Sequence, residues 1–488
     1  MDVSEAIQGL TPQAVWEHFA RIAAIPRPSK KEEKVAAHVL KIARENNLRA
    51  ERDATGNIAV RKPPSPGKEA SPMVALQSHL DMVCEKDRAS THDFDADGIQ
   101  LVRSNGYIHA NGTTLGSDNG IGVAVALSVM LDKSLVHGPL EFLFTVDEET
   151  GLTGASGLRP GFLKSRLLLN LDSEEDGAVY VGCSGGRDTV FTFRIRREPV
   201  PPGYEPLGFA VRGLRGGHSG LDINAGRGNA IKLMARALWA IGNSNDIRIA
   251  AIEVGSKRNA IPREAEILLY IHGEHSSAVR TEVEALNTII KSEYSTSEPS
   301  LALELVSRKP SANERVLAKA DQERLLSLLV ILPHGVLAMS VDIPGLVETS
   351  TNVATIQSEP EAVVVATSQR SSVKTALDDV INSLRVMGKL VDADVKHSDG
   401  YPGWKPNLDS HALKVTRETY MQLYGREPAV KAIHAGLECG VIGEKYPGID
   451  MVSFGPTIEG AHSPRERVEI ATVQRFWNLL VGVLKNLS

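Results

Sequence analysis

The chain has 488 residues, more than one hydrophobic core usually holds, so we expect at least two domains. Its composition, 42% hydrophobic and 23% charged, is that of an ordinary globular protein, and its net charge of −6 favours neither nucleic acid nor an anionic membrane as a partner. We find no secretory signal, and no apolar run approaches the ~20 residues that span a bilayer. The three cysteines are too widely spaced for a disulfide framework or a CxxC metal site. We therefore expect a cytoplasmic protein.

The first elements expected along the chain are two helices. Pro12 suits the first position of a helix in TPQAVWEHFARIAAI, where Thr11 could provide the cap. Ser29 and Glu32 have the spacing of a capping box ahead of the next apolar-periodic run. A strand is expected in TGNIAVRKP, and the prolines of PPSPGKEASP then indicate a solvent-exposed loop.

Apolar strands and helices alternate after this loop. The expected strands are MVALQSHLDMV, LEFLFTV, RLLLNLD and, near the C-terminus, DMVSFGP. The helices are NGIGVAVALSVMLDKS and the long EIATVQRFWNLLVGVLKNL. Strands that are apolar throughout indicate a sheet covered on both faces. We therefore predict an α/β fold with a mixed, mostly parallel sheet sandwiched by helices, in which sites gather at the carboxyl ends of strands.

The middle of the chain has a different pattern, with strands that alternate between apolar and polar residues and with denser turn signals. RNAIPREAEILLYIHGEHSSAVRTEVEALNTII can be aligned with TNVATIQSEPEAVVVATSQRSSVKTALDDVINSL, which places Asn259 opposite Asn352. We predict an inserted α+β lid domain formed by internal duplication, with chance similarity of two α/β segments as the alternative. The predicted boundaries are 1–186 and 390–488 for the catalytic domain and 187–389 for the lid, in halves of about 187–298 and 299–389.

Acidic and histidine residues stand at the ends of the predicted strands or in the loops that follow. In FLFTVDEETGLTGA, the acids Asp147–Glu149 directly follow an apolar strand, and adjacent carboxylates repel unless a cation or a proton lies between them. Taken singly, each such residue is more often a core histidine, a helix cap or a solvated turn. Together, two histidines and three carboxylates suit two divalent ions of the zinc, cobalt or manganese type. They occupy five places along the chain, namely His79 (with Asp81 two residues on), Asp118, one of the pair Glu148 and Glu149, Asp172 and His462.

The motifs SHLDMV, LGSDNGIGVA, DEETGLTGA, LDSEEDG and GAHSP, in this order, resemble those of the cocatalytic-zinc peptidases, which include aminoacylase, carnosinase and glutamate carboxypeptidase. The resemblance covers essentially the whole chain, and HAGLECG and GYPGWKPN resemble a dipeptidase branch of the family. It implies a zinc exopeptidase-like catalytic domain and a metal-dependent dipeptidase. Such an enzyme would cleave unblocked dipeptides, Xaa-His among them, with two Zn²⁺ ions or with Co²⁺ or Mn²⁺.

The resemblance also implies a role for each residue at the strand ends. Asp118 would bridge the two metals, and its peptide bond to Asn119 would be cis. Glu148 would take a proton from water and later deliver it to the leaving amine. Asp81 would accept from the second ring nitrogen of His79 and so orient it. The implied ligands are His79 and Asp172 for one ion, Glu149 and His462 for the other, and Asp118 for both.

Residues of the predicted lid would bind substrate by the same resemblance. His218 in RGGHSGLDI would donate to the oxyanion, although alone it would be an ordinary turn residue. Asn259 and Arg370 would hold the substrate's carboxylate, for which the planar guanidinium fork is suited. Gly436 and Glu438 would meet the substrate beside the metals. In many relatives the lid histidine comes from a partner subunit, so a homodimer and completion of the site within one chain both stay open.

Three other functions compete with this prediction. GCSGG, residues 182–186, matches G-x-S-x-G with Ser184 as nucleophile, but that motif needs a helix next, and RDTVFTFRIRR alternates like a strand. A non-catalytic binding protein would be expected to have lost Glu148 or a ligand, and none is missing. An amidase of the same clan, acting on N-acyl or N-carbamoyl amino acids, is the main alternative. A small peptide is the expected partner, with no nucleic acid and no membrane.

Overall fold

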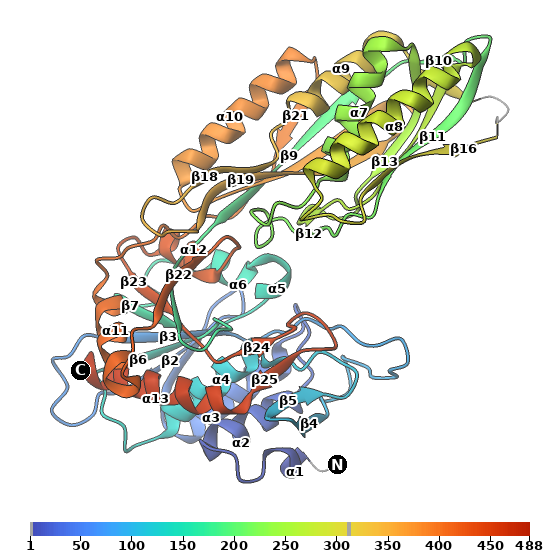
Figure 1. Ribbon diagram of the computed structural model, residues 1–488. Helices are drawn as coiled ribbons and strands as arrows, with labels where there is room; N and C mark the ends of the chain where they lie inside the picture. The colour runs from blue at the N-terminus through green and yellow to red at the C-terminus, as the bar shows by residue number, and fades with distance from the viewer. Residues whose placement is uncertain (1–2, 310–313) are drawn as a thin grey trace. The chain divides into compact units, whose positions relative to one another are not determined.

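The computed structural model describes residues 3–309 and 314–488, and the chain divides into two units (Figure 1). The first unit comprises Met1–Gly182, Trp404–Ala432 and Leu437–Ser488, and the second comprises Cys183–Gly403 and Ile433–Gly436. The predicted lid boundaries, 187 and 389, both lie inside the second unit. The second unit extends further because β21 (Asp394–His397) pairs with β9 (Gly185–Arg194), which places residues beyond 389 in the sheet of the insertion.

An eight-stranded mixed sheet forms the centre of the first unit. Its central strands β6, β3, β7 and β23 are parallel to one another, whereas β2 and β8 flank them in the antiparallel direction. This arrangement confirms the predicted α/β class with a mixed sheet. Across the sheet the strands are β1 (Arg49–Arg52), β2 (Ile58–Lys62), β6 (Leu140–Thr145), β3 (Val74–His79), β7 (Leu167–Asn170), β23 (Asp450–Ser453), β8 (Ala178–Cys183) and β22 (Ala429–Ile433).

Helices cover both faces of this sheet, which explains why its strands lack a polar face. Every residue of β3 and β6 is buried. Helix α4 (Ser117–Leu131), itself apolar almost all round, packs on β3, while Ala75, Leu143 and Leu168 share a core with α6 (Thr153–Gly157) and α12 (Glu438–Lys445). In Figure 1, α6 and α12 lie on one side of the sheet and α2 and α4 on the other. The remaining helices are α1 (Val3–Ile7), α2 (Gln13–Ala23), α3 (Glu33–Glu45), α5 (Glu148–Gly151), α11 (His411–Tyr424) and α13 (Ile470–Asn486).

A smaller antiparallel sheet also belongs to the first unit. It pairs β24 (Ile458–Glu459), β25 (Arg467–Glu469), β5 (Tyr107–Ala110) and β4 (Leu101–Ser104) in that order. The segment between β24 and β25 contains His462, so this sheet positions one of the predicted metal ligands. Among the described residues, no helix is both long and apolar enough to cross a lipid bilayer.

The predicted capping box at the start of α3 is wrong. The helix begins at Glu33, and no side chain caps it. The Ser29 hydroxyl instead donates to Asp81 at 2.7 Å, and Glu32 accepts the backbone N–H groups of Lys30 and Asp147. The two residues therefore have tertiary partners, which the local spacing could not reveal.

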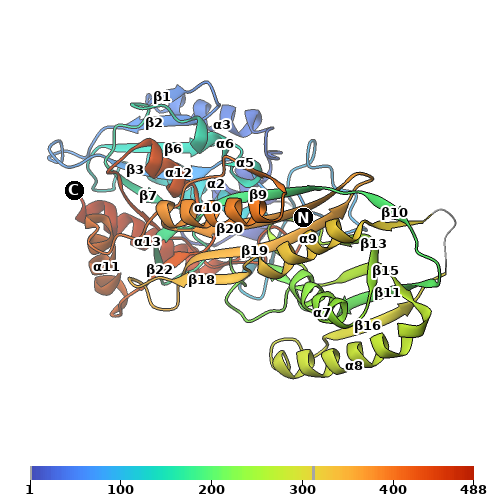
Figure 2. The ribbon, with the colours of Figure 1, turned by 90° about the horizontal axis from the view of Figure 1, so that it is seen from above.

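The second unit is built on a nine-stranded antiparallel sheet. The order is β16 (Ala302–Ser307), β11 (Tyr204–Arg212), β15 (Ala265–His272), β13 (Ile247–Val254), β19 (Val347–Ser358), β20 (Ala362–Ser371), β9 and β21, with β18 (Gly335–Met339) beside β19. Two short ribbons pair β12 (Gly217–His218) with β14 (Ala260–Ile261) and β10 (Arg197–Pro199) with β17 (Arg315–Leu317). Four helices cover one face in both views, namely α7 (Ala230–Ser244), α8 (Ser276–Glu293), α9 (Lys319–Ile331) and α10 (Lys374–Leu390) (Figures 1 and 2).

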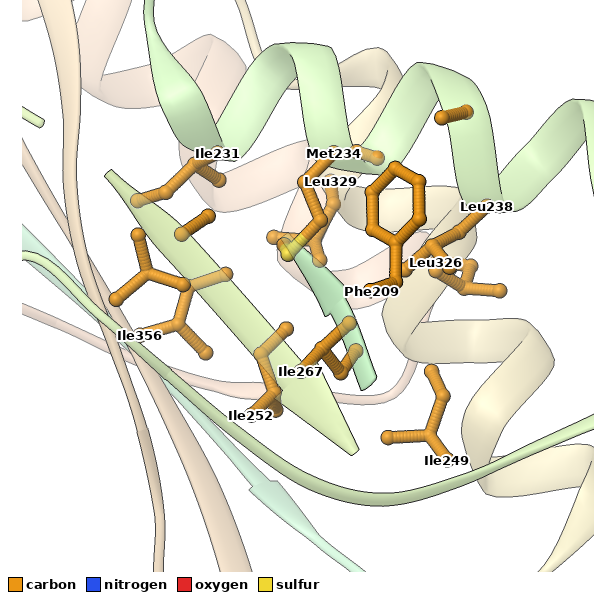
Figure 3. Packing of buried hydrophobic residues seen from close by; sticks show 14 of the residues in the cluster. Phe209, Ile231, Met234, Leu238, Ile249, Ile252, Ile267, Leu326, Leu329 and Ile356 are labelled. Atoms are coloured by element: carbon orange, nitrogen blue, oxygen red, sulfur yellow. The ribbon is translucent and has the colours of Figure 1, made fainter. Parts of the chain in front are cut away.

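The core of the second unit lies between this sheet and its helices (Figure 3). Phe209 and Ile267 project from neighbouring strands toward Met234 of α7 and Leu329 of α9, and all four are buried. The strands show the alternation of buried and partly exposed residues that is expected of a sheet covered on one face. In β15, for example, every second residue along the first half is buried. The N-terminus of α7 is capped by the Asn229 side chain, which accepts from the backbone N–H of Ile231 at 2.9 Å.

Candidate functional site

All five predicted metal ligands converge at the carboxyl end of the parallel strands of the first unit. His79 is the last residue of β3, Glu149 lies in α5 directly after β6, and Asp172 follows β7. Asp118 lies in the first turn of α4, where the peptide bond to Asn119 is cis as the family resemblance implied. His462 reaches the same place from the segment between β24 and β25.

Asp118 lies between the two histidines. Its Oδ1 is 2.9 Å from His79 Nε2, and its Oδ2 is 3.2 Å from His462 Nε2. His79 Nε2 is also 3.2 Å from Asp172 Oδ1, and His462 Nε2 is 3.0 Å from Glu149 Oε2. Two ligand groups therefore share Asp118, and within each the ligand atoms lie within 4.8 Å of one another. A further group within the same 4.8 Å limit comprises His79, Glu148 and Glu149.

The carboxylates of this cluster are difficult to ionise together. Burial, and then the negative charges of Asp172, Glu438 and Glu149, raise the pKa of Glu148 well above its usual value. Burial likewise raises the pKa of Asp172 to about 6. Glu149 Oε1 is buried and has no hydrogen-bond partner among the described residues. A set of imidazole nitrogens and crowded carboxylate oxygens fits two divalent cations, which would supply the missing positive charge.

Asp81 organises the surroundings of the ligands. Its side chain is fully buried, accepts the backbone N–H groups of Glu148 at 3.1 Å and Glu149 at 3.2 Å, and lies 3.3 Å from His79 Nδ1. Burial raises the pKa of Asp81, but these contacts and the Ser29 hydroxyl outweigh it and lower the pKa to about 2. One carboxylate thus fixes both the imidazole ring and the turn that contains the two glutamates.

The first acid of the run that follows β6 has a structural role. Asp147 is buried, has a left-handed backbone with φ of 50°, and accepts the hydroxyls of Thr150 and Thr153. It therefore stabilises the tight turn from which Glu148 and Glu149 project. Three adjacent acids thus divide into one that shapes the turn and two that belong to the cluster.

Glu466 supports the cluster, although nothing in the sequence pattern predicted this role. It is buried, and its two oxygens accept the backbone N–H groups of Leu115, Gly116, Ser117 and Asp118 at 2.7–3.2 Å, together with the Ser117 hydroxyl. Because Glu466 follows His462 by four residues, it ties the segment of one ligand to the segment of another. Its sequence context, SPRERVEI, resembles an ordinary exposed turn, and its partners are some 350 positions away.

Arg27 and Glu174 were not predicted from the sequence either. The buried Arg27 guanidinium donates to the backbone carbonyls of Leu80 and Asp81 at 2.9 and 2.6 Å and to that of Gly116. Gly116 has φ of 68°, and a Cβ there would lie 2.5 Å from the guanidinium, so both conformation and space require glycine. Burial, followed by the charges of Asp118 and Asp172, raises the pKa of Glu174 to about 9.

Glu438 lies beneath the cluster at the start of α12. It is fully buried, and its Oε2 accepts from Gln77 Nε2 at 2.5 Å and from the Thr145 hydroxyl at 2.6 Å. Burial is the largest cause that raises its pKa to about 8. The predicted substrate-binding residue Glu438 is therefore a largely neutral acid at neutral pH, held against the carboxyl ends of β3 and β6.

The other predicted substrate residues belong to the second unit. His218 and Asn259 lie beside each other, because β12 pairs with β14 and the Ser219 N–H donates to the Asn259 carbonyl at 2.9 Å. His218 Nδ1 accepts from the backbone N–H of Leu221 at 3.0 Å, so a neutral imidazole has its proton on Nε2. Arg370 is on β20, and Gly436 packs against the ring of Tyr401.

Ser184 does not have the surroundings of a catalytic nucleophile. It is buried between β8 and β9, and a strand rather than a helix follows it. The strand–turn–helix context of the G-x-S-x-G motif is therefore missing, as the sequence predicted.

Glu466 can be tested as the support of Asp118. In Glu466→Gln, one acceptor oxygen becomes an amide that faces backbone N–H donors, so the segment at residues 115–118 should loosen. We expect about 10–100-fold weaker metal binding, measured by competition with a chelator. Glu141→Gln is the matched control, because Glu141 is also buried and accepts the backbone N–H groups of Lys164 and Ser165 away from the cluster. Equal metal affinity in both variants would contradict the role of Glu466.

The raised pKa of Glu438 predicts that the stability of the folded protein depends on pH. The folded state keeps the Glu438 proton up to about pH 8, whereas the unfolded chain releases it near pH 4.5. The free energy of unfolding should therefore fall as pH rises between these values, by at most about 1.4 kcal/mol per pH unit. Glu438→Gln cannot ionise and should escape this loss.

The measurement is urea unfolding of the metal-stripped proteins. We expect Glu438→Gln to match the wild type near pH 4.5 and to be the more stable protein at pH 8. Replacing the exposed Glu69 by glutamine provides the control and should produce no such difference. A constant offset between Glu438→Gln and the wild type at all pH values would refute the raised pKa.

Comparisons with known proteins identify the family of the chain. The sequence profile of peptidase family M20/M25/M40 matches residues 75–486. The chain is 42% identical over 479 residues to the cytosol non-specific dipeptidase of Escherichia coli (strain K12), with 98% of both proteins covered. Its structure is similar to that of aminoacylhistidine dipeptidase from Vibrio alginolyticus, with a TM-score of 0.90, 42% identity, and coverage of 98% of this chain and 97% of that one.

A more distant structure shares the fold alone. Aminopeptidase PepT from Bacillus cereus is 17% identical, with a TM-score of 0.58 and coverage of 98% of this chain and 99% of the other. The resemblance drawn from the sequence motifs is confirmed by the profile match and by the identity over nearly the whole chain. On these grounds the protein belongs to peptidase family M20/M25/M40.

Proposed function

We propose that this protein is a metal-dependent dipeptidase that hydrolyses unblocked dipeptides, Xaa-His among them, with broad side-chain tolerance. The observation that carries the proposal is the pair of ligand groups joined by Asp118, with Glu148 held beside them by Asp81. The names of the two relatives at 42% identity, both dipeptidases, support the substrate class.

The proposed ligands are His79 and Asp172 for one ion, Glu149 and His462 for the other, and Asp118 for both. Two divalent ions at these ligands would activate a water molecule and polarise the scissile carbonyl. Glu148 would then act as the base, taking a proton from water and returning it to the leaving amine. Asp81 keeps the backbone of Glu148 and the ring of His79 in place during this exchange.

The second unit would supply the residues that bind substrate. His218 is suited to stabilise the oxyanion, because its Nδ1 is occupied as an acceptor and its proton is therefore on Nε2. Asn259 and Arg370, which line one cavity, would hold the terminal carboxylate. Gly436 would border the substrate, and the fully buried Glu438 would support the site from beneath the metal ligands.

Zn²⁺ is the metal we propose, with Co²⁺ and Mn²⁺ as alternatives, because histidine and carboxylate ligands suit all three. An internal duplication of the second unit is supported by a similar order of elements, α7-β13-β14-β15-α8 and α9-β18-β19-β20-α10. Location in the cytosol agrees with the name of the Escherichia coli relative. A homodimer remains a proposal that rests on the family resemblance.

Substrate hydrolysis tests the proposed activity. We expect the metal-loaded enzyme to cleave a panel of free dipeptides, including Xaa-His, and to leave N-acyl and N-carbamoyl amino acids intact. Exhaustive chelation should abolish the cleavage, and Zn²⁺, Co²⁺ or Mn²⁺ should restore it, because the ions activate the water. Cleavage of the acyl amino acids in preference to dipeptides would instead establish the amidase.

Variants of Glu148 and Glu149 should distinguish a catalytic role from metal binding. Glu148→Gln should lower kcat by about 10²–10⁴-fold with both ions retained, because the variant lacks only the base. Glu149→Gln, changed at the adjacent position, should lose metal because it removes a proposed ligand. Metal content by elemental analysis distinguishes the two variants, and loss of metal in Glu148→Gln would show that Glu148 is itself a ligand.

A further inference from the structure

We propose that Tyr401 is a positioning residue for recognition of the substrate's carboxylate. Its phenol holds one end of the Arg370 guanidinium, so that the other edge is presented to the terminal carboxylate of a dipeptide. This inference rests on the proposed dipeptidase function and adds to it a residue that determines how the enzyme recognises a free C-terminus.

The two side chains face the same cavity of the second unit. The cavity has a volume of about 280 Å³, and Arg370, Tyr401, Asn259 and Arg258 are among the residues that line it. Asp188 also lines it, but its carboxylate pairs with Arg258 at 3.0 Å. The cavity therefore has more positive than negative side chains, and its one aspartate already has a cationic partner.

Arg370 is an unusual residue within this lining. Its side chain is only 7% exposed, yet it forms no ion pair with any described carboxylate. Nη1 donates to the Tyr401 hydroxyl at 2.7 Å, while Nε is buried and has no hydrogen-bond partner among the described residues. A buried cation without a counter-charge is costly. An anionic ligand at the Nε side of the guanidinium would remove that cost.

The backbone shows why Tyr401 can reach Arg370. Gly186 of β9 lies opposite Arg370 of β20, and on its other side Gly186 and Tyr401 exchange two backbone hydrogen bonds of 3.0 and 2.9 Å. The tyrosine ring lies across Gly186, where a Cβ would be 2.7 Å from the ring and its hydroxyl. The absence of a side chain at residue 186 thus lets the phenol extend over one strand to the guanidinium of the next.

A second glycine, Gly436, leaves space for the ring of Tyr401. A Cβ at Gly436 would lie 2.8 Å from the Tyr401 ring, so Gly436 also leaves space that the ring fills. The two glycines come from GCSGG and HAGLECG and the tyrosine from GYPGWKPN, three motifs that are separated in the sequence. Their common physical basis is a tyrosine packed between two residues that have no side chain.

This arrangement suits the two oxygens of a carboxylate. With Nη1 occupied by the phenol, Nε and Nη2 form the edge of the guanidinium that pairs side-on with the two oxygens of a carboxylate. Removing the phenol would let the guanidinium rotate and weaken binding of the carboxylate. The phenol is proposed to contact no reacting atom, so its loss should raise KM and leave kcat nearly unchanged.

The experiment compares Tyr401→Phe with the wild type on a dipeptide and on the same dipeptide with an amidated C-terminus. We expect KM for the free dipeptide to rise about tenfold in Tyr401→Phe, kcat to stay within about twofold, and the kinetics with the amide to be unchanged. Where the amide is not cleaved, its inhibition constant replaces its KM. Tyr204→Phe is the matched control, because Tyr204 is in the same unit and its hydroxyl donates to Asp246 at 2.6 Å, but it does not line the cavity.

Two results would overturn the inference. Equal losses on the acid and the amide would indicate a structural role for the phenol, and unchanged kinetics on both would indicate no role. A wild type that cleaves no dipeptide would refute the proposed function, whereas a wild type that cleaves dipeptides beside an unaltered Tyr401→Phe would refute this inference alone. Thermal unfolding of Tyr401→Phe checks that the fold is retained, which we expect because the variant keeps the aromatic ring.

Discussion

Repulsion among the carboxylates at the strand ends is the constraint that the site of the first unit must satisfy. The parallel strands β3, β6 and β7 end side by side, and each end brings an acid or a histidine to the same place. Burial there raises the pKa values of Glu148, Glu149 and Asp172, so positive charge must be supplied or protons retained. The position of Asp118 between two imidazoles indicates how two cations would divide the acids between them.

Buried groups outside the ligand set hold this crowded arrangement together. Asp81 binds two backbone amides of the acidic turn, and Glu466 binds four amides of the segment that contains Asp118. Arg27 joins the carbonyl of Asp81 to that of Gly116 in the Asp118 segment. The charged groups are satisfied mainly by backbone dipoles, which have one orientation in the folded chain. Such a frame keeps ligands close before any ion binds, and this lowers the cost of bringing like charges together.

The sequence was most informative where chemistry is concentrated in short motifs. The α/β class, the strand ends and the five clustered residues could be predicted, because apolar runs and acidic residues are visible locally. The capping box predicted at Ser29 and Glu32 is wrong because both side chains bind tertiary partners that the local sequence does not reveal. Glu466 and Arg27 could not be found for the same reason, because their role depends on backbone groups that are distant in sequence. The pairing of β21 with β9, which extends the second unit beyond residue 389, could not be foreseen because it joins strands some 200 residues apart.

Charge is distributed in opposite ways in the two units, and in the second unit this bears on recognition of the substrate's carboxylate. In the first unit, buried acids outnumber their basic neighbours around the ligands, whereas in the second a buried arginine faces a cavity with no free carboxylate among the described residues. Contact with the terminal carboxylate fixes the position of the substrate's chain end only if the guanidinium itself cannot turn. Tyr401, packed between Gly186 and Gly436, supplies that restraint, since its hydroxyl accepts a hydrogen bond from Arg370 Nη1 at 2.7 Å. A guanidinium held in one orientation would favour substrates that end in a free carboxylate, which agrees with the proposed hydrolysis of unblocked dipeptides.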